Sequence, residues 1–261
     1  MLRPVLVSIA ATFVASLTLV SAPTHAVPVG TTPFVGEDFQ GRPCHGRKEN
    51  YGPFDYLERA ALPGELNVVE KHHFNSDVEH LIRGQTSPTP MGDISYTLYA
   101  WPNHHRALYS AIRFRLRGYP EYRIPKNRKI PTAECFLQRA IQFSPRDATT
   151  YMLYGILLQR TKQPEKALQQ YRLAHNINPK DTQIIYNMAL VLVELGELDE
   201  AQKLADQVYA TDFPLKGLQK RLDQARAAQN PDSAATTEEK QAKPKAPPAN
   251  KKIKDLFPNS Q

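Results

Sequence analysis

Five histidines in the first half of the chain come closest, by type and spacing, to a chemical site: His72, His73, His80, His104 and His105. Imidazole groups bind metal ions and exchange protons near neutral pH. However, His104 and His105 are adjacent, and adjacent residues on a helix point about 100° apart, so they cannot easily face one ion. The sequence also has no HExxH motif and no nucleophile with a base and an orienting group.

We therefore expect these histidines to be structural. His104 and His105 are predicted to cap and pack the start of a helix, while His72 and His73 pack against the segment before it. A metal site formed by His72, His73, His104 and His105 stays open as the weaker alternative. The prediction is a chain without a catalytic residue, a cofactor or a bound metal.

The chain has two cysteines, Cys44 and Cys135. In an oxidising compartment two such thiols tend to pair. A disulfide here closes a loop of about 90 residues, which the loop-entropy model values at about 4 kcal/mol. Two free buried thiols are the alternative, and the lack of a CxxC spacing argues against a zinc site.

Three arginines are suited to binding rather than to catalysis. Arg106, Arg113 and Arg117 share one stripe of an expected helix, and guanidinium groups pair well with carboxylates. Together with side chains of two later helices, they predict a concave groove that is basic at its N-terminal end and mixed at its C-terminal end. The residues predicted to line this groove are Arg106, Tyr109, Arg113, Arg117, Met152, Ile156, Arg160, Tyr186, Asn187 and Leu190.

Four prolines mark the elements that must position these side chains: Pro102, Pro145, Pro179 and Pro214, at spacings of 43, 34 and 35. A 34-residue period is that of the tetratricopeptide repeat (TPR), a helical hairpin whose second helix ends near a proline. The predicted fold is all-α, a TPR helical-hairpin solenoid of about three repeats. Its predicted parts are an irregular N-terminal segment and cap (27–101), an array within 102–229 with repeats at 105–147, 148–181 and 182–214, and a C-terminal capping helix at 215–229.

The packing positions of the second and third repeats carry suitable residues. Gly155 and Ala167 are small where two helices of one hairpin must approach closely. Pro164 stands at the start of a helix, where its missing N–H costs nothing. The first repeat has nine extra residues, which predicts an insertion between its two helices within 118–131.

Both ends of the chain differ from the middle in composition. Arg3, the apolar run 5–20 and the small residues before Val27 predict a signal peptide over 1–26, cleaved near Ala26, with an uncleaved anchor as the alternative. The mature chain is then expected to have no transmembrane segment and to be periplasmic. Residues 230–261 are rich in Ala, Lys, Pro and Glu, and predict a disordered tail.

Several short segments before the repeats resemble those of a family of exported bacterial TPR proteins. They are Cys44, the YGPFDY segment at 51–56, the HF pair at 73–74 and the PNHHRAL segment at 102–108. The resemblance spans about 44–220. It implies the repeat architecture and export, and it supplies no catalytic residue.

The formal net charge of +7 is compatible with anionic partners, and no nucleic-acid-binding motif is present. The function expected is that of an exported scaffold or adaptor that holds an acidic protein or peptide segment in the groove. The alternatives are an envelope factor that associates with anionic polysaccharide and a metal-binding protein that uses the histidines. The oligomeric state is left open.

Overall fold

The computed structural model describes residues 32–47, 51–118 and 130–229. Within these ranges the chain is helical, apart from loops and an isolated bridge between Glu37 and Pro43. The elements are η1 (Tyr56–Glu58), α1 (Pro63–His73), α2 (Ser76–Glu79), α3 (Pro90–Ala100), α4 (His105–Leu116), α5 (Ala133–Phe143), α6 (Ala148–Arg160), α7 (Pro164–Ile177), α8 (Thr182–Leu195), α9 (Leu198–Tyr209) and α10 (Gly217–Gln229). The expected signal peptide, the tail and nearly all of the expected insertion lie outside the described residues.

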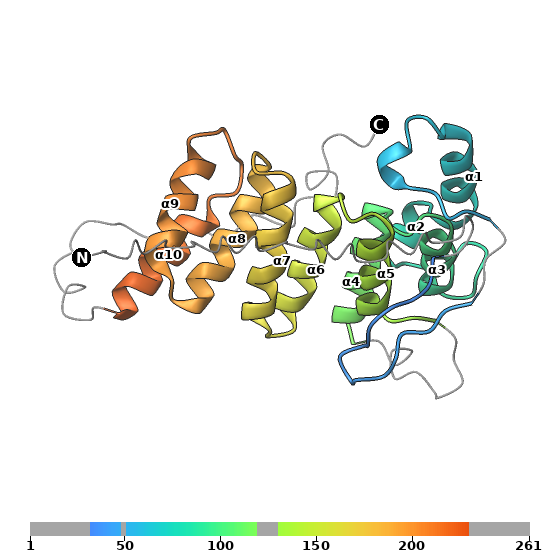
Figure 1. The fold of residues 1–261 in the computed structure, drawn as a ribbon, viewed down its shortest axis with the longest axis horizontal. Helices are drawn as coiled ribbons and strands as arrows, with labels where there is room; N and C mark the ends of the chain where they lie inside the picture. Colours follow the sequence, from blue (N-terminus) through green and yellow to red (C-terminus); the bar gives the residue numbers. More distant parts are fainter. Residues whose placement is uncertain (1–31, 48–50, 119–129, 230–261) are drawn as a thin grey trace, which may run out of the picture.

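The expected repeats form three helical hairpins, α4–α5, α6–α7 and α8–α9. Each hairpin packs on the next through contacts between α5 and α6 and between α7 and α8, and α10 packs on α8 and α9. Figure 1 shows the result as an elongated row, with α1–α3 at one end and α9–α10 at the other. This α-helical repeat solenoid is the fold that the 34-residue period predicts. None of the described helices is long and apolar enough to cross a bilayer.

Local signals set the ends of the repeat helices. The side chains of Thr132, Asp147 and Asp181 cap α5, α6 and α8 by accepting backbone N–H groups of the first turn. Pro164 occupies the first position of α7, as predicted. Gly196 ends α8 with φ of 80°, a left-handed conformation that favours glycine.

The hydrophobic core runs along the array and changes partners at α6. Leu153 and Leu157 on one side of α6 belong to the core shared with α2–α5, whereas Met152 and Leu158 belong to the core shared with α7–α10. Close packing inside the second hairpin depends on Gly155. A Cβ atom there would lie 2.6 Å from the ring of the fully buried Tyr171.

The region before the array is more helical than the sequence predicts. Helix α1 was not predicted, because only Val69 among its residues is buried and its apolar periodicity is weak. Helix α2 ends at Glu79, and Leu81, just beyond it, adopts a positive φ of 61°. Helix α3 begins at Pro90, where the missing N–H of proline costs nothing.

Residues 32–47 turn back on themselves at the bridge between Glu37 and Pro43 and contact α3 and α5, and we call this segment the N-terminal strap. Its Cys44 forms a disulfide with Cys135 of α5, with Cα atoms 5.5 Å apart, which confirms the predicted pairing. Phe34 packs between Tyr99 and Phe136, with both ring centroids 5.6 Å away. The strap is thus held by a covalent bond and by the packing of a half-buried aromatic side chain.

Candidate functional site

The Pro102–Leu108 segment, singled out by its residue types, joins four separate parts of the chain. Asn103 is fully buried, and its Nδ2 donates to Asp55 Oδ1 at 2.7 Å and to Asp147 Oδ2 at 2.8 Å. Its Oδ1 accepts the backbone N–H of Tyr56 at 2.9 Å. One amide therefore connects η1, which Asp55 caps, to the N-terminus of α6, which Asp147 caps.

His104 caps α4, as the sequence predicts. Its Nδ1 accepts the backbone N–H of Ala107 at 3.1 Å, so the ring proton is on Nε2, which donates to Glu70 Oε1 at 2.9 Å. Burial lowers the pKa of His104 below its ordinary value, and this outweighs the opposing effect of Glu70. The imidazole is consequently a neutral structural group that links α4 to α1.

His105 bonds to a different carboxylate. Its Nε2 lies 2.8 Å from Asp147 Oδ2, the oxygen that Asn103 also contacts. Burial raises the pKa of Asp147, but the hydrogen bonds and charge of its partners, His105 first among them, bring the pKa below its ordinary value. Asp147 is therefore a carboxylate that joins α4 to α6.

The two earlier histidines do not join this pair. His73 Nδ1 lies 2.9 Å from Asp93 Oδ1, its ring stacks on Tyr96 at 3.8 Å, and His72 is exposed. Asp93 is fully buried and also accepts the backbone N–H groups of Gln85, Thr86 and Ser87. Each of these histidine contacts is thus with a separate carboxylate, and the described part of the chain has no group of three or more His, Cys, Asp or Glu residues that could hold a metal ion.

The predicted arginine stripe lies apart from the concave pocket. Arg106 forms a two-pronged ion pair with Glu79, whose first bond joins Nε to Oε1 at 2.8 Å and whose second joins Nη2 to Oε2. Its Nη1 also lies 3.6 Å from Glu70. Arg113 donates to the backbone carbonyl of Glu79 at 3.4 Å. Arg106 therefore ties α4 to α1 and α2, because two carboxylates distant in the sequence lie beside it.

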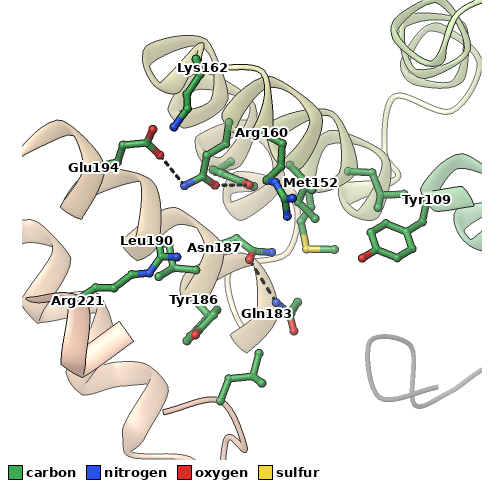
Figure 2. Close-up of a pocket in the computed structure, with 15 residues that line it drawn as sticks. Tyr109, Met152, Arg160, Lys162, Gln183, Tyr186, Asn187, Leu190, Glu194 and Arg221 are labelled. Atoms are coloured by element: carbon green, nitrogen blue, oxygen red, sulfur yellow. Dashed lines mark hydrogen bonds between the residues drawn. The ribbon is translucent and has the colours of Figure 1, made fainter. Parts of the chain in front are cut away.

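A pocket of about 500 Å³ lies among the helices of the array, and we call it the concave pocket (Figure 2). It is formed by residues of α4, α6, α7 and α8, by Lys162 in the turn between α6 and α7, by Leu215 before α10 and by Arg221 in α10. Seven of the ten residues predicted for the groove line it, and Arg106, Arg113 and Arg117 do not. The residues that line the pocket include Tyr109, Met152, Ile156, Gln159, Arg160, Lys162, Tyr171, Gln183, Tyr186, Asn187, Leu190, Glu194, Leu215 and Arg221.

The lining of the pocket mixes apolar and polar side chains. Met152, Ile156 and Leu190 offer aliphatic surface between the aromatic rings of Tyr109 and Tyr186. Asn187 accepts a hydrogen bond from Gln183 through Oδ1 at 3.4 Å, and its buried Nδ2 has no partner among the described residues.

A hydrogen-bond chain crosses one end of the pocket. Tyr171 donates to Gln159 Oε1 at 3.1 Å, and Gln159 Nε2 donates to Glu194 Oε2 at 3.1 Å. Burial first, and the Glu194 charge second, raise the pKa of Tyr171 far above its ordinary value, so its hydroxyl stays a neutral donor. The side-chain orientation of Glu194 is therefore set by two residues of the preceding repeat.

Sequence reasoning missed the contribution of the last helix to the pocket. Leu215 and Arg221 line it, although they follow the third repeat and were assigned only to a cap. The 34-residue period does not predict where these two residues lie, because they are outside the repeats. Arg221 points from α10 toward the middle of the pocket, and Arg160 points into it from α6 (Figure 2).

Comparison with known proteins bears on the repeats alone. Residues 126–208, about a third of the chain, match the model of the family described as "Anaphase-promoting complex, cyclosome, subunit 3". This is a family with TPR-like repeats, and the matched stretch includes α5 to α8 and nearly all of α9. No curated protein matches the chain. The match supports a TPR-type repeat, a kind of domain that generally binds proteins and has no catalytic activity of its own.

Proposed function

We propose that this protein is an exported, non-catalytic scaffold that holds an acidic segment of a partner protein in the concave pocket. The observation that carries the proposal is the convergence of side chains from α4, α6, α8 and the α10 region on one pocket. Repeat arrays present such concave surfaces to extended partners. Its aliphatic and aromatic side chains would contribute buried area on binding.

Of the four arginines predicted for the groove, Arg160 lines the pocket, and the other positive side chains there belong to Lys162 and Arg221. Arg160, Lys162 and Arg221 line the pocket, are exposed and form no ion pair with any residue of the described ranges. Arg106, by contrast, is paired with Glu79 and Glu70 of the same chain. Its replacement would therefore disturb the junction between α1, α2 and α4 and would not test partner binding.

Crosslinking in living cells tests the proposal. A photo-reactive amino acid at Leu190, in the pocket, should crosslink a defined partner that mass spectrometry identifies, whereas the same residue at the exposed Leu173 of α7 should not. Arg160→Glu with Arg221→Glu should abolish the crosslink, while the matched exposed pair Lys180→Glu with Lys203→Glu should keep it. Equal crosslinking from Leu173 and Leu190 would contradict the proposal.

Export rests on the N-terminal sequence and on the disulfide, since buried disulfides persist in oxidising compartments. The mature N-terminus, read by mass spectrometry from a periplasmic fraction, should lie near Val27. A full-length chain recovered from the cytoplasm with both thiols free would refute export.

A further inference from the structure

Two equivalent positions in successive repeats line the pocket with side chains of opposite charge. One repeat of 34 residues separates each of three pairs of lining residues, namely Met152 and Tyr186, Ile156 and Leu190, and Arg160 and Glu194. The first two pairs are apolar or aromatic in both repeats. The third changes from a cation to an anion, so equivalent places on α6 and α8 present opposite charges to one ligand.

Neither charge is neutralised by a salt bridge within the described ranges. Arg160 and Glu194 are exposed, and no ion pair joins either of them to another described residue. The bond that Glu194 does make comes from the uncharged Gln159. Because a carboxylate can only accept, Gln159 must present its nitrogen to Glu194 and its oxygen to Tyr171. Glu194 is thus held in place with its negative charge intact.

The cationic side of the pocket has more than one contributor. Arg160 from α6 and Arg221 from α10 both point toward the space around Asn187 and Leu190, whereas Lys162 lies on the Glu194 side of the pocket (Figure 2). A carboxylate bound near Asn187 gains attraction from the two arginines. A second carboxylate placed beside Glu194 would instead be repelled, and like charges in a partly enclosed site disfavour a ligand.

We infer that the preferred partner segment carries both signs of charge, an acidic side chain for Arg160 and Arg221 and a basic side chain for Glu194. This inference rests on the proposed function and narrows its acidic partner. Packed helices such as α6 and α8 have axes about 8–10 Å apart, and an extended peptide advances about 3.3 Å per residue. A segment crossing the two helices therefore presents its acidic and basic residues about three positions apart.

Glu194 is consequently a specificity-determining residue rather than a general contact. Its removal should lower the discrimination against uniformly acidic segments, while the attraction of Arg160 and Arg221 for one carboxylate remains. Exchange of the two charges, Arg160→Glu with Glu194→Arg, should reverse the order of acidic and basic residues along the preferred segment. Both positions are exposed, so the exchange leaves the packed core untouched.

Selection from a displayed library of short random peptides on the purified full chain tests this inference. A peptide counts as pocket-dependent when its enrichment is lost on the Leu190→Asp variant. This variant must keep the helical circular dichroism of the wild type. The wild type should enrich an acidic and a basic residue about three apart, about fivefold over peptides with two acidic residues. Glu194→Gln should remove the preference for the basic residue, the double exchange should reverse the order, and Glu165→Gln, at an exposed position on α7, should change nothing.

Two other outcomes are distinguishable. Pocket-dependent peptides that are uniformly acidic, and unchanged by Glu194→Gln, would overturn the charge-pair inference and leave the proposed scaffold function standing. The absence of any pocket-dependent peptide would refute the proposed function, and the inference would fail with it.

Discussion

Replacement of Asn103 by alanine tests whether the buried amide holds the N-terminal region to the repeats. The side chain makes three hydrogen bonds of 2.7–2.9 Å, two to carboxylates and one to a backbone N–H, and all of it is buried. Hydrogen bonds to charged groups contribute about 1.5–3 kcal/mol each and neutral ones about 1 kcal/mol. Asp55 and Asp147 keep other donors, Ser144 and His105, which limits the loss.

The expected cost of Asn103→Ala is therefore about 3–5 kcal/mol of the free energy of unfolding, which corresponds to a fall in Tm of about 10 °C for a chain of this size. Chemical denaturation followed by circular dichroism measures it. The matched control is Asn176→Ala, at an exposed position on α7, which should change stability by less than about 0.5 kcal/mol.

The loss of local stability caused by Asn103→Ala should be confined to particular segments of the chain. Hydrogen exchange should accelerate at the backbone amides of Tyr56 and of the first turns of α4 and α6, with little change in α8 and α9. Asn103→Asp should be at least as damaging, since it places a third carboxylate against Asp55 and Asp147. A loss below about 1 kcal/mol for Asn103→Ala would show that water replaces the amide and that the reasoning is wrong.

Three further predictions concern the disulfide, the helix packing and the buried imidazole. Replacing Cys44 and Cys135 by alanine opens a loop with a sequence separation of 91 and should cost about 4.5 kcal/mol, measured by denaturation with and without reductant, which should affect only the wild type. Gly155→Ala should cost about 1–3 kcal/mol in the same assay, because the added Cβ meets the ring of Tyr171; a neutral result would show that the hairpin can widen freely. Since the pKa of His104 is lowered by burial, its stabilising effect is present above pH 6.5, the ordinary value, and is lost as pH falls toward the folded pKa. The fall in Tm between neutral and mildly acidic pH should therefore be smaller for His104→Asn, which can still cap the helix, and an equal fall would contradict the assignment.

The repeats could be predicted because each is specified by local residues. Pro164 at a helix start and Gly155 beside Tyr171 act within one hairpin, and the 34-residue period repeats the pattern. The capping role of His104 was also predictable, since the residue and the amide it accepts are three positions apart. Such short-range constraints can be read without knowledge of the rest of the fold.

The region before the array could not be predicted in the same way. Helix α1 has a weak apolar pattern, and its position depends on contacts such as that of Glu70 with His104, 34 residues later. The roles of Arg106 and Glu79 likewise depend on segments 27 residues apart that no repeat relates. The spacing of arginines along a helix does not show whether their side chains face solvent or form ion pairs within the protein.

For this protein, then, the sequence by itself determined the helical hairpins and the seven predicted residues that meet in the pocket. Periodicity specifies these features because every repeat has the same local geometry. The pairing of Cys44 with Cys135 was predicted from the number of cysteines and the expected export, and the tertiary structure brings the two residues together. Only the tertiary structure decided that Arg106 is engaged inside the chain, that Arg221 reaches the pocket from α10, and that Asn103 joins two capping carboxylates. These depend on the packing of segments far apart in the chain, and burial and charge pairing are properties of that packing.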